Sequence, residues 1–423
     1  MLARAGQAIN ERISSKHPLR FNRTAWRYGY DQRGHSPFVF RSGGSFQQKV
    51  FHIYLGLAAA YLLWRFVPRL PLSRKCRALI SALVVATAMH FLAFQLVWGN
   101  MFSPEFPRPL VAAVGFLFGA FGLLVAFTVV CDAVSIVWRC MRISGWSRRR
   151  DALLRGAAGV LALCLSAAGI WAATRLPEVR RIEVNVGNLA PRLDGFTLVQ
   201  LSDLHISRLF PEEWVSGVVA RTNALRPDLV VITGDLIDGH VTARKADVRP
   251  LAALSAHHGV LAILGNHEYY FGADAWREEF EALGMRMLVN EHAVVSTSGG
   301  SLVVTGIPDP VAASFSEEPP NFQKAVAGAS PDQPMILLSH RPSDAEQHAQ
   351  AGVALQLSGH THGGMLRGFD WFVARLNEGF VSGLYEIGGM HLYVSNGTGL
   401  WNGFPLRIGV PAEITEFVLR AKR

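Results

Sequence analysis

Five short blocks in the second half of the sequence carry Asp, Asn and His, the residue types that bind divalent metal ions. In chain order they are Ser202-Asp203-Leu204-His205, Gly234-Asp235, Gly265-Asn266-His267-Glu268, Ser339-His340 and Gly359-His360-Thr361-His362. Carboxylates and neutral imidazoles are common metal ligands. The alternation in Asp203-x-His205 and His360-x-His362 lets two side chains from one turn reach a common centre. Taken together, the blocks predict a metal cluster.

Each block follows a short run of apolar residues. The runs are residues 196–201, 229–233, 260–264, 335–338 and 353–357. Such runs, with helix-like stretches between them, are typical of strands buried on both faces of a layered α/β domain. Because ligands bind at the carboxyl ends of such strands, the blocks should converge. A single Asp or His after a strand is commonly a turn or capping residue, but five successive coincidences argue against that alternative.

Two other residue types in the blocks, glycine and glutamate, are expected to support the ligands rather than bind metal. The glycines before Asp235, Asn266 and His360 permit sharp backbone turns close to a ligand. Glu268 is expected to cap or orient its neighbours, so we do not count it as a ligand.

The two halves of the 423-residue chain differ in charge. Residues 1–181 contain 24 Lys and Arg against 6 Asp and Glu, whereas residues 182–423 contain 17 against 26. The formal net charge of +9 is therefore the sum of +18 in the first half and −9 in the second, and we expect no nucleic-acid partner. All four cysteines lie in the first half, which excludes a disulfide framework or a Cys-ligated metal from the second.

Four apolar runs in the first half predict membrane-spanning helices. They cover residues 50–67, 78–98, 110–138 and 156–173, close to the ~20 residues that a helix needs to cross a bilayer. We therefore predict three parts: a basic N-terminal tail (1–49), a four-span transmembrane region (50–174) and a catalytic domain (182–423). His90 and Asp132 lie inside predicted spans, where an ionisable group serves either function or helix packing.

The charges flanking the spans bear on orientation. Ten cations lie in the two linkers after the first and third spans: Arg69, Arg74, Lys75, Arg77, Arg139, Arg142, Arg148, Arg149, Arg150 and Arg155. The positive-inside rule places these linkers in the cytoplasm and the second half of the chain on the extracytoplasmic side of the cell membrane. Seven cations of the N-terminal tail favour the opposite orientation, but on the count of the short linkers we expect the catalytic domain on the extracytoplasmic side.

The five blocks, in this order, resemble those of the calcineurin-like metallophosphoesterase superfamily. The similarity covers about residues 182–420. Ser339-His340-Arg341-Pro342, residues 357–364 and residues 393–395 through 411–415 resemble the membrane-anchored bacterial phosphodiesterase branch in particular. The resemblance implies a sandwich of two β-sheets flanked by helices, here preceded by the four-helix transmembrane region.

The resemblance also implies a role for each residue. Asp203, His205 and His362 would hold one metal ion, Asn266, His340 and His360 the other, and Asp235 would bridge the two. His267 matches the catalytic histidine that protonates the leaving oxygen or stabilises the transition state. The ligand types favour Mn, Fe, Zn or Co over Mg or Ca. Two such ions would activate a water as hydroxide for attack on phosphorus.

Two positions depart from the branch. Met365 stands where Gln is common and Asn396 where Arg is frequent, so contacts to the non-reacting part of a substrate are in doubt. Beyond His362, the aromatic stretches 369–376 and 380–384 suit a bilayer interface and could admit a lipid-borne phosphoester. Alternatively, they pack on the domain core or on the transmembrane part.

Two functions follow from these observations. The first is a membrane-bound, binuclear-metal phosphoesterase acting on a phosphodiester rather than a monoester, with a lipid-linked substrate such as a nucleotide-activated glycolipid as one candidate. The second is a non-catalytic membrane receptor that uses a domain of this type to bind a partner. The complete set of seven ligands and His267 favours the enzyme, because a decayed site would lose ligands first.

Overall fold

The computed structural model describes residues 46–142 and 147–421, so most of the predicted basic tail lies outside the described residues. Four long helices come first: α2 (Phe46–Arg65), α3 (Arg74–Trp98), α4 (Arg108–Cys140) and α5 (Arg148–Thr174). Ser73 and Ser147 cap α3 and α5 by accepting hydrogen bonds from the backbone N–H groups of Cys76 and Arg150. All four helices are long and apolar enough to cross a membrane, as predicted.

A partly buried ion-pair network joins three of these helices. The Asp132 carboxylate of α4 accepts hydrogen bonds from Arg155 of α5 (2.5 Å), and from Arg65 (2.7 Å) and Tyr61 (2.8 Å) of α2. Arg155 is 1% exposed and also pairs with Asp151 at 3.0 Å. Charges inside an apolar region are tolerated when they are paired in this way. Asp132 therefore has a structural role in holding the helices together.

His90 also makes packing contacts. Its Nδ1 lies 2.6 Å from the carbonyl oxygen of Thr87, one turn earlier on α3. Its ring packs at centroid distances of 3.9–5.3 Å against Phe91, Phe94 and Phe118. These contacts belong to the interior of the helix bundle.

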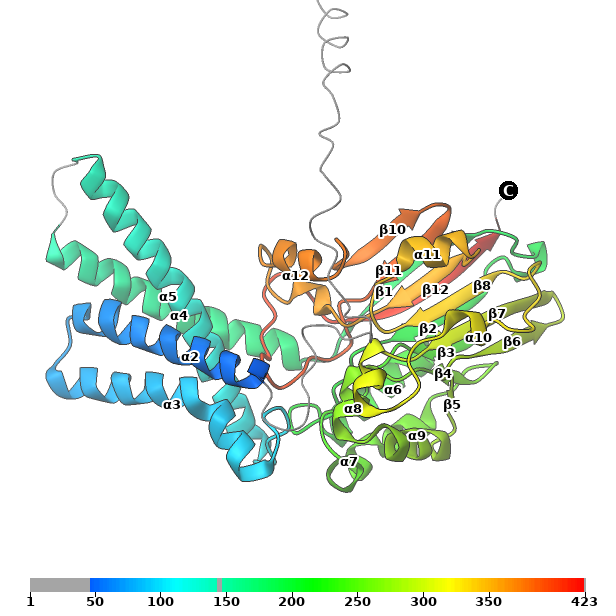
Figure 1. Cartoon of the computed structure of the whole chain (residues 1–423), viewed down its shortest axis with the longest axis horizontal. Coiled ribbons are helices and arrows are strands. Elements are labelled where there is room, and N and C mark those ends of the chain that lie inside the picture. The colour runs from blue at the N-terminus through cyan, green and yellow to red at the C-terminus, as the bar shows by residue number, and fades with distance from the viewer. Residues whose placement is uncertain (1–45, 143–146, 422–423) are drawn as a thin grey trace, which may run out of the picture. The chain divides into compact units, whose positions relative to one another are not determined.

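The rest of the chain forms two six-stranded mixed sheets (Figure 1). The first has the order β1 (Glu178–Val186), β12 (Glu413–Ala421), β2 (Thr197–Leu201), β3 (Leu229–Ile232), β4 (Val260–Ala262) and β5 (Arg286–Met287). The second has the order β10 (Gly383–Ile387), β11 (Met390–Val394), β9 (Leu355–Ser358), β8 (Met335–Ser339), β7 (Gly300–Ile307) and β6 (Glu291–Thr297). The five predicted strands are β2, β3, β4, β8 and β9.

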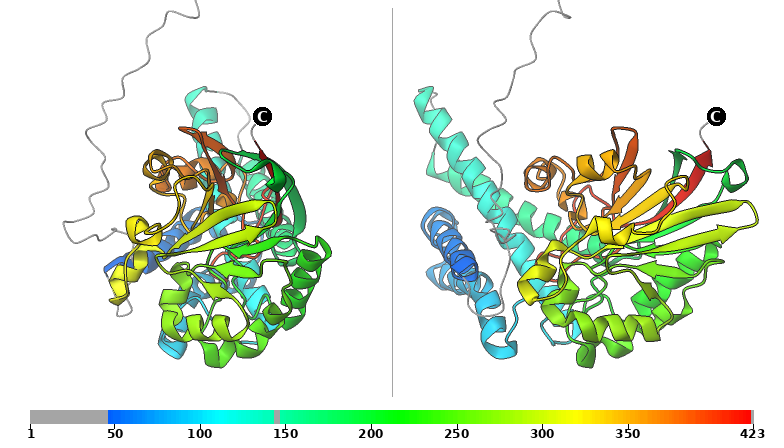
Figure 2. Two further views of the ribbon diagram at one scale, coloured as in Figure 1. Left: turned by 90° about the vertical axis from the view of Figure 1, so that its right-hand side faces the viewer. Right: turned by 45° about the vertical axis from the view of Figure 1, so that its right-hand side comes forward.

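The two sheets lie face to face (Figure 2), and one hydrophobic core fills the space between them. Leu198 and Val231 of the first sheet share this core with Val304, Leu338 and Tyr393 of the second. The five predicted strands lack an apolar–polar alternation because both of their faces are covered. The predicted two-sheet sandwich is confirmed.

Short helices cover the outer faces. Helices α6 (Glu212–Ala224), α7 (Val241–Val248) and α9 (Ala273–Ala282) flank the first sheet (Figure 1). A smaller core on the second sheet includes Ala325 of α10 (Phe322–Ala325) and Ala345 of α11 (Ala345–Gln350). Helix α8 (Asn266–Phe271) begins within the third predicted block, and α12 (Asp370–Leu376) follows the fifth.

Candidate metal centre

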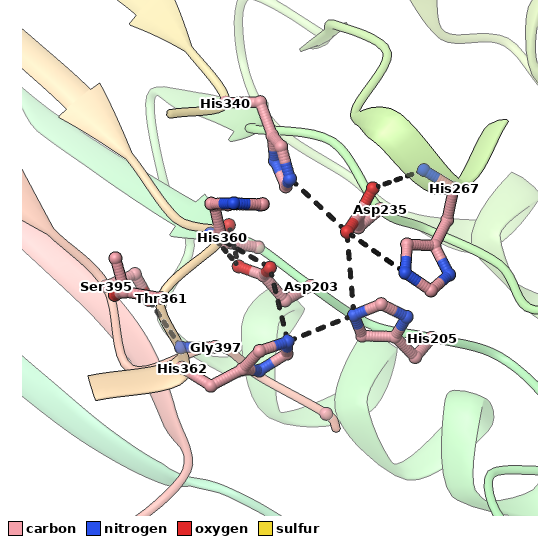
Figure 3. Close-up of polar contacts among 12 residues, drawn as sticks. Asp203, His205, Asp235, His267, His340, His360, Thr361, His362, Ser395 and Gly397 are labelled. Atoms are coloured by element: carbon pink, nitrogen blue, oxygen red, sulfur yellow. Dashed lines mark hydrogen bonds and ion pairs between the residues drawn. The ribbon is translucent and has the colours of Figure 1, made fainter. Parts of the chain in front are cut away.

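The residues of the five blocks meet at one edge of the sandwich. Asp203 and His205 follow β2, Asp235 follows β3, and Asn266 and His267 begin α8 just after β4. His340 follows β8, and His360 and His362 follow β9. Figure 3 shows the carboxylates and imidazoles turned toward one another. The structure therefore brings together side chains that are up to 159 positions apart, from Asp203 to His362.

One group of three consists of Asp203, His205 and His362. Their ligand atoms all lie within 4.8 Å of one another, and all three residues are buried. His205 Nε2 lies 3.2 Å from His362 Nε2, and His362 Nε2 lies 3.7 Å from Asp203 Oδ1. These are the residues that the resemblance assigns to a first metal ion.

A second group of three consists of Asp235, His340 and His360, again within 4.8 Å. Asp235 Oδ2 lies 3.2 Å from His340 Nε2 and 3.7 Å from His205 Nε2. Asp235 thus reaches residues of both groups, as a bridging ligand must.

The backbone of the site is unusual. Five of the seven predicted ligands have a positive φ: Asp203 (52°), His205 (44°), Asp235 (55°), His360 (69°) and His362 (50°). Non-glycine residues rarely adopt this left-handed conformation, and such residues cluster at functional sites. The strain turns side chains from successive strand ends inward.

The glycines of the blocks act mainly by leaving space. A Cβ atom at Gly265 would lie 2.2 Å from Asp235 Oδ1, and one at Gly359 would lie 2.0 Å from Ser202 Oγ. Only Gly234, with a φ of 89°, also has the left-handed backbone that the sharp-turn interpretation expected. At Gly265 and Gly359 the close approach of a neighbouring chain segment is what requires glycine.

Asp238 is a member of the site that the sequence did not reveal. A single oxygen, Asp238 Oδ1, accepts hydrogen bonds from Nδ1 of His205 (3.1 Å) and from Nδ1 of His267 (2.5 Å). Asp238 therefore orients one predicted ligand and the predicted catalytic histidine together. The only sequence feature that could have identified Asp238 is its position three residues after Asp235, and that position alone does not mark it as a site residue.

His267 is placed to hold a proton. Its ring lies in T-shaped contact with that of His205, 4.5 Å between centroids, and its Nε2 lies 3.9 Å from Asp235 Oδ2. Burial opposes the charge on this imidazole, but Asp235 and Asp238 outweigh that effect and raise its pKa to about 9. At neutral pH, His267 can therefore donate a proton.

Glu268 orients its neighbours, as the sequence analysis expected. Its carboxylate accepts hydrogen bonds from the backbone N–H groups of Asp235 (3.0 Å), Leu236 (2.7 Å) and Gly265 (2.7 Å). These bonds fasten the turn after β3 to the start of α8. Asp235 and His267 are consequently fixed relative to each other.

The nitrogen lone pairs of the site fit a cation. His205 donates through Nδ1, so its Nε2 lone pair faces His362 Nε2. His340 donates through Nδ1 to the carbonyl oxygen of Thr233 (2.8 Å), so its Nε2 lone pair faces the Asp235 carboxylate. Converging lone pairs repel one another unless a proton or a metal ion lies between them.

Two further observations agree with a cation. Asn266 Oδ1 is buried and has no hydrogen-bond partner among the described residues. Burial opposes a charge on His340, but Asp235 and Asp203 raise its pKa to about 10. The site thus attracts positive charge strongly, and its donor set suits transition metals.

Arg341 brings positive charge to the other side of the site. Its guanidinium binds Asp309 through Nε (2.6 Å) and Nη2 (3.1 Å), and its side chain stays 26% exposed. Burial first, and then the charges of Arg341 and His340, lower the pKa of His360 well below its ordinary value. The charge of Arg341 therefore reaches the predicted ligands.

The departures from the branch have different surroundings. Asn396 is buried, accepts a hydrogen bond from Ser382 Oγ (2.6 Å) and donates its backbone N–H to Glu413 (3.0 Å). Met365 is half-buried in the turn before α12, with a φ of 61°. Asn396 therefore supports the loop after β11.

Comparison with known proteins agrees with this geometry. The sequence model for the calcineurin-like phosphoesterase family matches residues 196–364. A Bos taurus protein, "Transmembrane protein with metallophosphoesterase domain", is 33% identical over 322 residues, which cover 72% of each chain. An uncharacterized metallophosphoesterase of Campylobacter jejuni is 34% identical over 62% of this chain and 69% of its own. One of Bacillus subtilis is 32% identical over 65% of this chain and 98% of its own.

Proposed function

Since the chain belongs to the calcineurin-like metallophosphoesterases, we propose that it is a membrane-bound phosphodiesterase whose substrate is lipid-linked. Membership of the family supports a metal-dependent phosphoester hydrolase, and the four apolar helices support a membrane protein. One observation favours an enzyme over a binding module. Six of the seven predicted ligands lie in two groups whose ligand atoms are within 4.8 Å of one another, and His267 lies beside Asp235. The seventh, Asn266, directly precedes His267. Such completeness is expected of an enzyme rather than of a binding module.

The proposed ligand sets follow the geometry. Asp203, His205 and His362 would hold one divalent ion, and Asn266, His340 and His360 the other, while Asp235 lies near residues of both sets. When bound, the two ions supply positive charge for the phosphoryl oxygens and an activated water at neutral pH. The ions belong to the Mn, Fe, Zn and Co class.

The other side chains have their own tasks. His267, which the resemblance assigns as the catalytic histidine, gives its proton to the leaving oxygen from its place beside Asp235 and Asp238. Asp238 holds the His267 ring in place through Nδ1, which leaves Nε2 to face the substrate. Arg341, partly exposed beside His340, binds a non-bridging phosphate oxygen.

Helix α12 supports a lipid-linked substrate. It follows the His362 turn and has no buried residue; its N-cap residue Phe369 is 45% exposed, Trp371 59% and Phe372 41%. The Arg375 guanidinium lies 5.4 Å from the centre of the Trp371 ring. Exposed Trp and Phe beside an Arg suit the headgroup zone of a bilayer. A substrate anchored there would reach the site directly.

Activity of the full-length protein tests the proposal. Purified in detergent and supplied with Mn, it should hydrolyse bis(p-nitrophenyl) phosphate faster than p-nitrophenyl phosphate. Asp235→Ala and His267→Ala should abolish turnover, whereas Asp194→Asn, on the distant Arg420 ion pair, should not. Equal rates in native and Asp235→Ala protein would overturn the proposal.

A further inference from the structure

The loop between α3 and α4, residues 99–107, contacts the catalytic domain beside His267. Ser103 Oγ donates a hydrogen bond to the backbone oxygen of Asp238 (3.1 Å). That same residue orients His205 and His267 through its carboxylate. The loop therefore reaches the turn that holds the proposed proton donor.

Charge pairs fasten the loop in this position. Glu105 binds Arg208 Nε at 3.0 Å and forms a second ion pair with Arg244. The Arg244 side chain is 0% exposed, and its Nε donates to the backbone oxygen of Asp238 (3.1 Å). A buried arginine needs such partners, and removing one of them is costly. The loop is thus part of a specific, charge-paired arrangement.

Phe102, at the tip of the loop, lies between the site and the membrane-spanning helices. Its ring centroid is 6.5 Å from that of His267, 5.3 Å from that of Trp401 and 6.3 Å from that of Phe91 on α3. Both Phe102 and Trp401 are half-buried. The two apolar rings, in contact with each other, therefore lie on the His267 side of the predicted metal centre.

A segment of the domain reaches back in the same region. Leu406 contacts Gly119 of α4 and Gly169 of α5, and Pro405 contacts Gly115 of α4. Arg407, the next residue, is buried and donates hydrogen bonds to the backbone oxygens of Asn396 (2.6 Å) and Gly399 (2.7 Å). The loop 99–107 thus binds the catalytic domain, and residues 405–407 of the domain bind α4 and α5. Together these contacts keep Phe102 and Trp401 in place.

We propose that Phe102 and Trp401 form a specificity wall that binds an apolar leaving alcohol of the substrate. The inference rests on the proposed function, because it takes His267 as the donor to the leaving oxygen. In the cleavage, the bond between phosphorus and that oxygen breaks, water supplies the new oxygen on phosphorus, and the proton passes from His267 to the alcohol. An alkyl chain on the alcohol then lies against the two rings and continues toward the spans.

A pair of soluble diesters tests this wall. Octyl phosphoglycerol and ethyl phosphoglycerol, both below their micellar concentrations, are compared by mass spectrometry of the released alcohol and glycerol phosphate. The native full-length protein with Mn should prefer the octyl ester in kcat/KM. Phe102→Ala should lower the octyl-to-ethyl ratio about 10-fold, the effect of losing one or two methylene contacts. Phe102→Leu should restore most of the ratio.

Phe106→Ala is the matched control. Phe106 lies on the same loop, and its ring packs on Phe94 and Trp98 of α3. This variant should keep the octyl-to-ethyl ratio of the native protein. If Phe102→Ala does not fold, Trp401→Ala removes the other ring from the domain side and should lower the ratio in the same direction.

The outcomes separate the two proposals. Native protein that cleaves bis(p-nitrophenyl) phosphate but shows no octyl preference, or a folded, metal-loaded Phe102→Ala protein with an unchanged ratio, overturns the specificity wall alone. Release of glycerol instead of octanol also overturns it. Native protein that cleaves no phosphoester overturns the proposed function itself.

Discussion

At the scale of single residues, the Asp238 carboxylate positions two histidines of the site. Asp238 Oδ1 accepts hydrogen bonds from both His205 and His267, and its other oxygen accepts the backbone N–H of Asn402 (3.2 Å). Residues that orient metal ligands fix the tautomer and direction of the imidazole. Asp238 therefore acts through its neighbours, as a positioning residue.

Asp238→Asn tests that role. An amide can present an NH₂ group to one histidine and so favours the wrong tautomer, and we expect kcat to fall about 10- to 100-fold. Metal content, measured by elemental analysis, should fall much less than in Asp203→Ala. A variant with native kcat would show that the two hydrogen bonds have no part in the chemistry.

The raised pKa values of His267 and His340 predict a pH effect on the metal-free protein. The folded-state pKa values of about 9 and about 10 exceed the ordinary value of 6.5. Their contribution to stability is therefore full below pH 6.5 and is lost as the pH rises through 9 to 10. The thermal midpoint measured in chelator should fall across this window.

Controls separate this effect from general alkaline unfolding. Added Mn should flatten the decline, because a cation replaces the protons. His340→Gln should also reduce the slope, whereas His257→Gln, at a side chain that is 75% exposed, should not. Identical slopes for His340→Gln and native protein would contradict the prediction.

At the scale of elements, strand ends from the two sheets approach so closely that only glycine fits. A Cβ at Gly359 would lie 2.0 Å from Ser202 Oγ and 2.2 Å from Asp203 Oδ2, between the ends of β9 and β2. Gly359→Ala should displace Asp203 and reduce activity about 100-fold, as a 1 Å misplacement can. Gly187→Ala, where no atom lies within 4 Å, is the control for kcat and thermal midpoint. Equal losses in both variants would refute the packing argument.

Helix α12 is the other element with a testable role. Replacing Trp371 and Phe372 with Ser should weaken hydrolysis of a phosphodiester embedded in vesicles, because the exposed rings no longer enter the headgroup zone. Hydrolysis of bis(p-nitrophenyl) phosphate should change little, since neither ring contacts the predicted ligands. Unchanged activity on the vesicle substrate, with unchanged folding, would exclude a membrane-contacting role for α12.

At the scale of the whole molecule, orientation limits the substrates. The Arg-rich linkers favour an extracytoplasmic catalytic domain. Protease added to sealed vesicles whose outer face is the extracytoplasmic one should therefore digest the domain, and inverted vesicles should protect it. Immunoblotting of an epitope in the domain reports both. The reverse pattern would place the domain in the cytoplasm.

The sequence predicted five buried strands and their ligand-bearing edge because such strands leave an uninterrupted apolar run before each block, whereas the two-sheet sandwich was implied by the family resemblance. Contacts between distant segments leave no such signature. Nothing in the spacing of Ser103 and Asp238, 135 residues apart, indicates that they meet. Asp238 itself was missed because a second Asp near Asp235 has no distinctive neighbours. The pairing of β1 with β12 was equally hidden, since edge partners far apart in sequence share no local pattern.

The position of β12 also has a consequence for biosynthesis. β12 lies between β1 and β2, parallel to the first and antiparallel to the second. Both neighbours leave the ribosome long before β12 is made, with the entire second sheet translated in between. Until β12 inserts, β1 and β2 have unpaired inner edges, which invite association with other chains. Nascent protein at this stage should depend on a chaperone or on rapid translation to avoid aggregation.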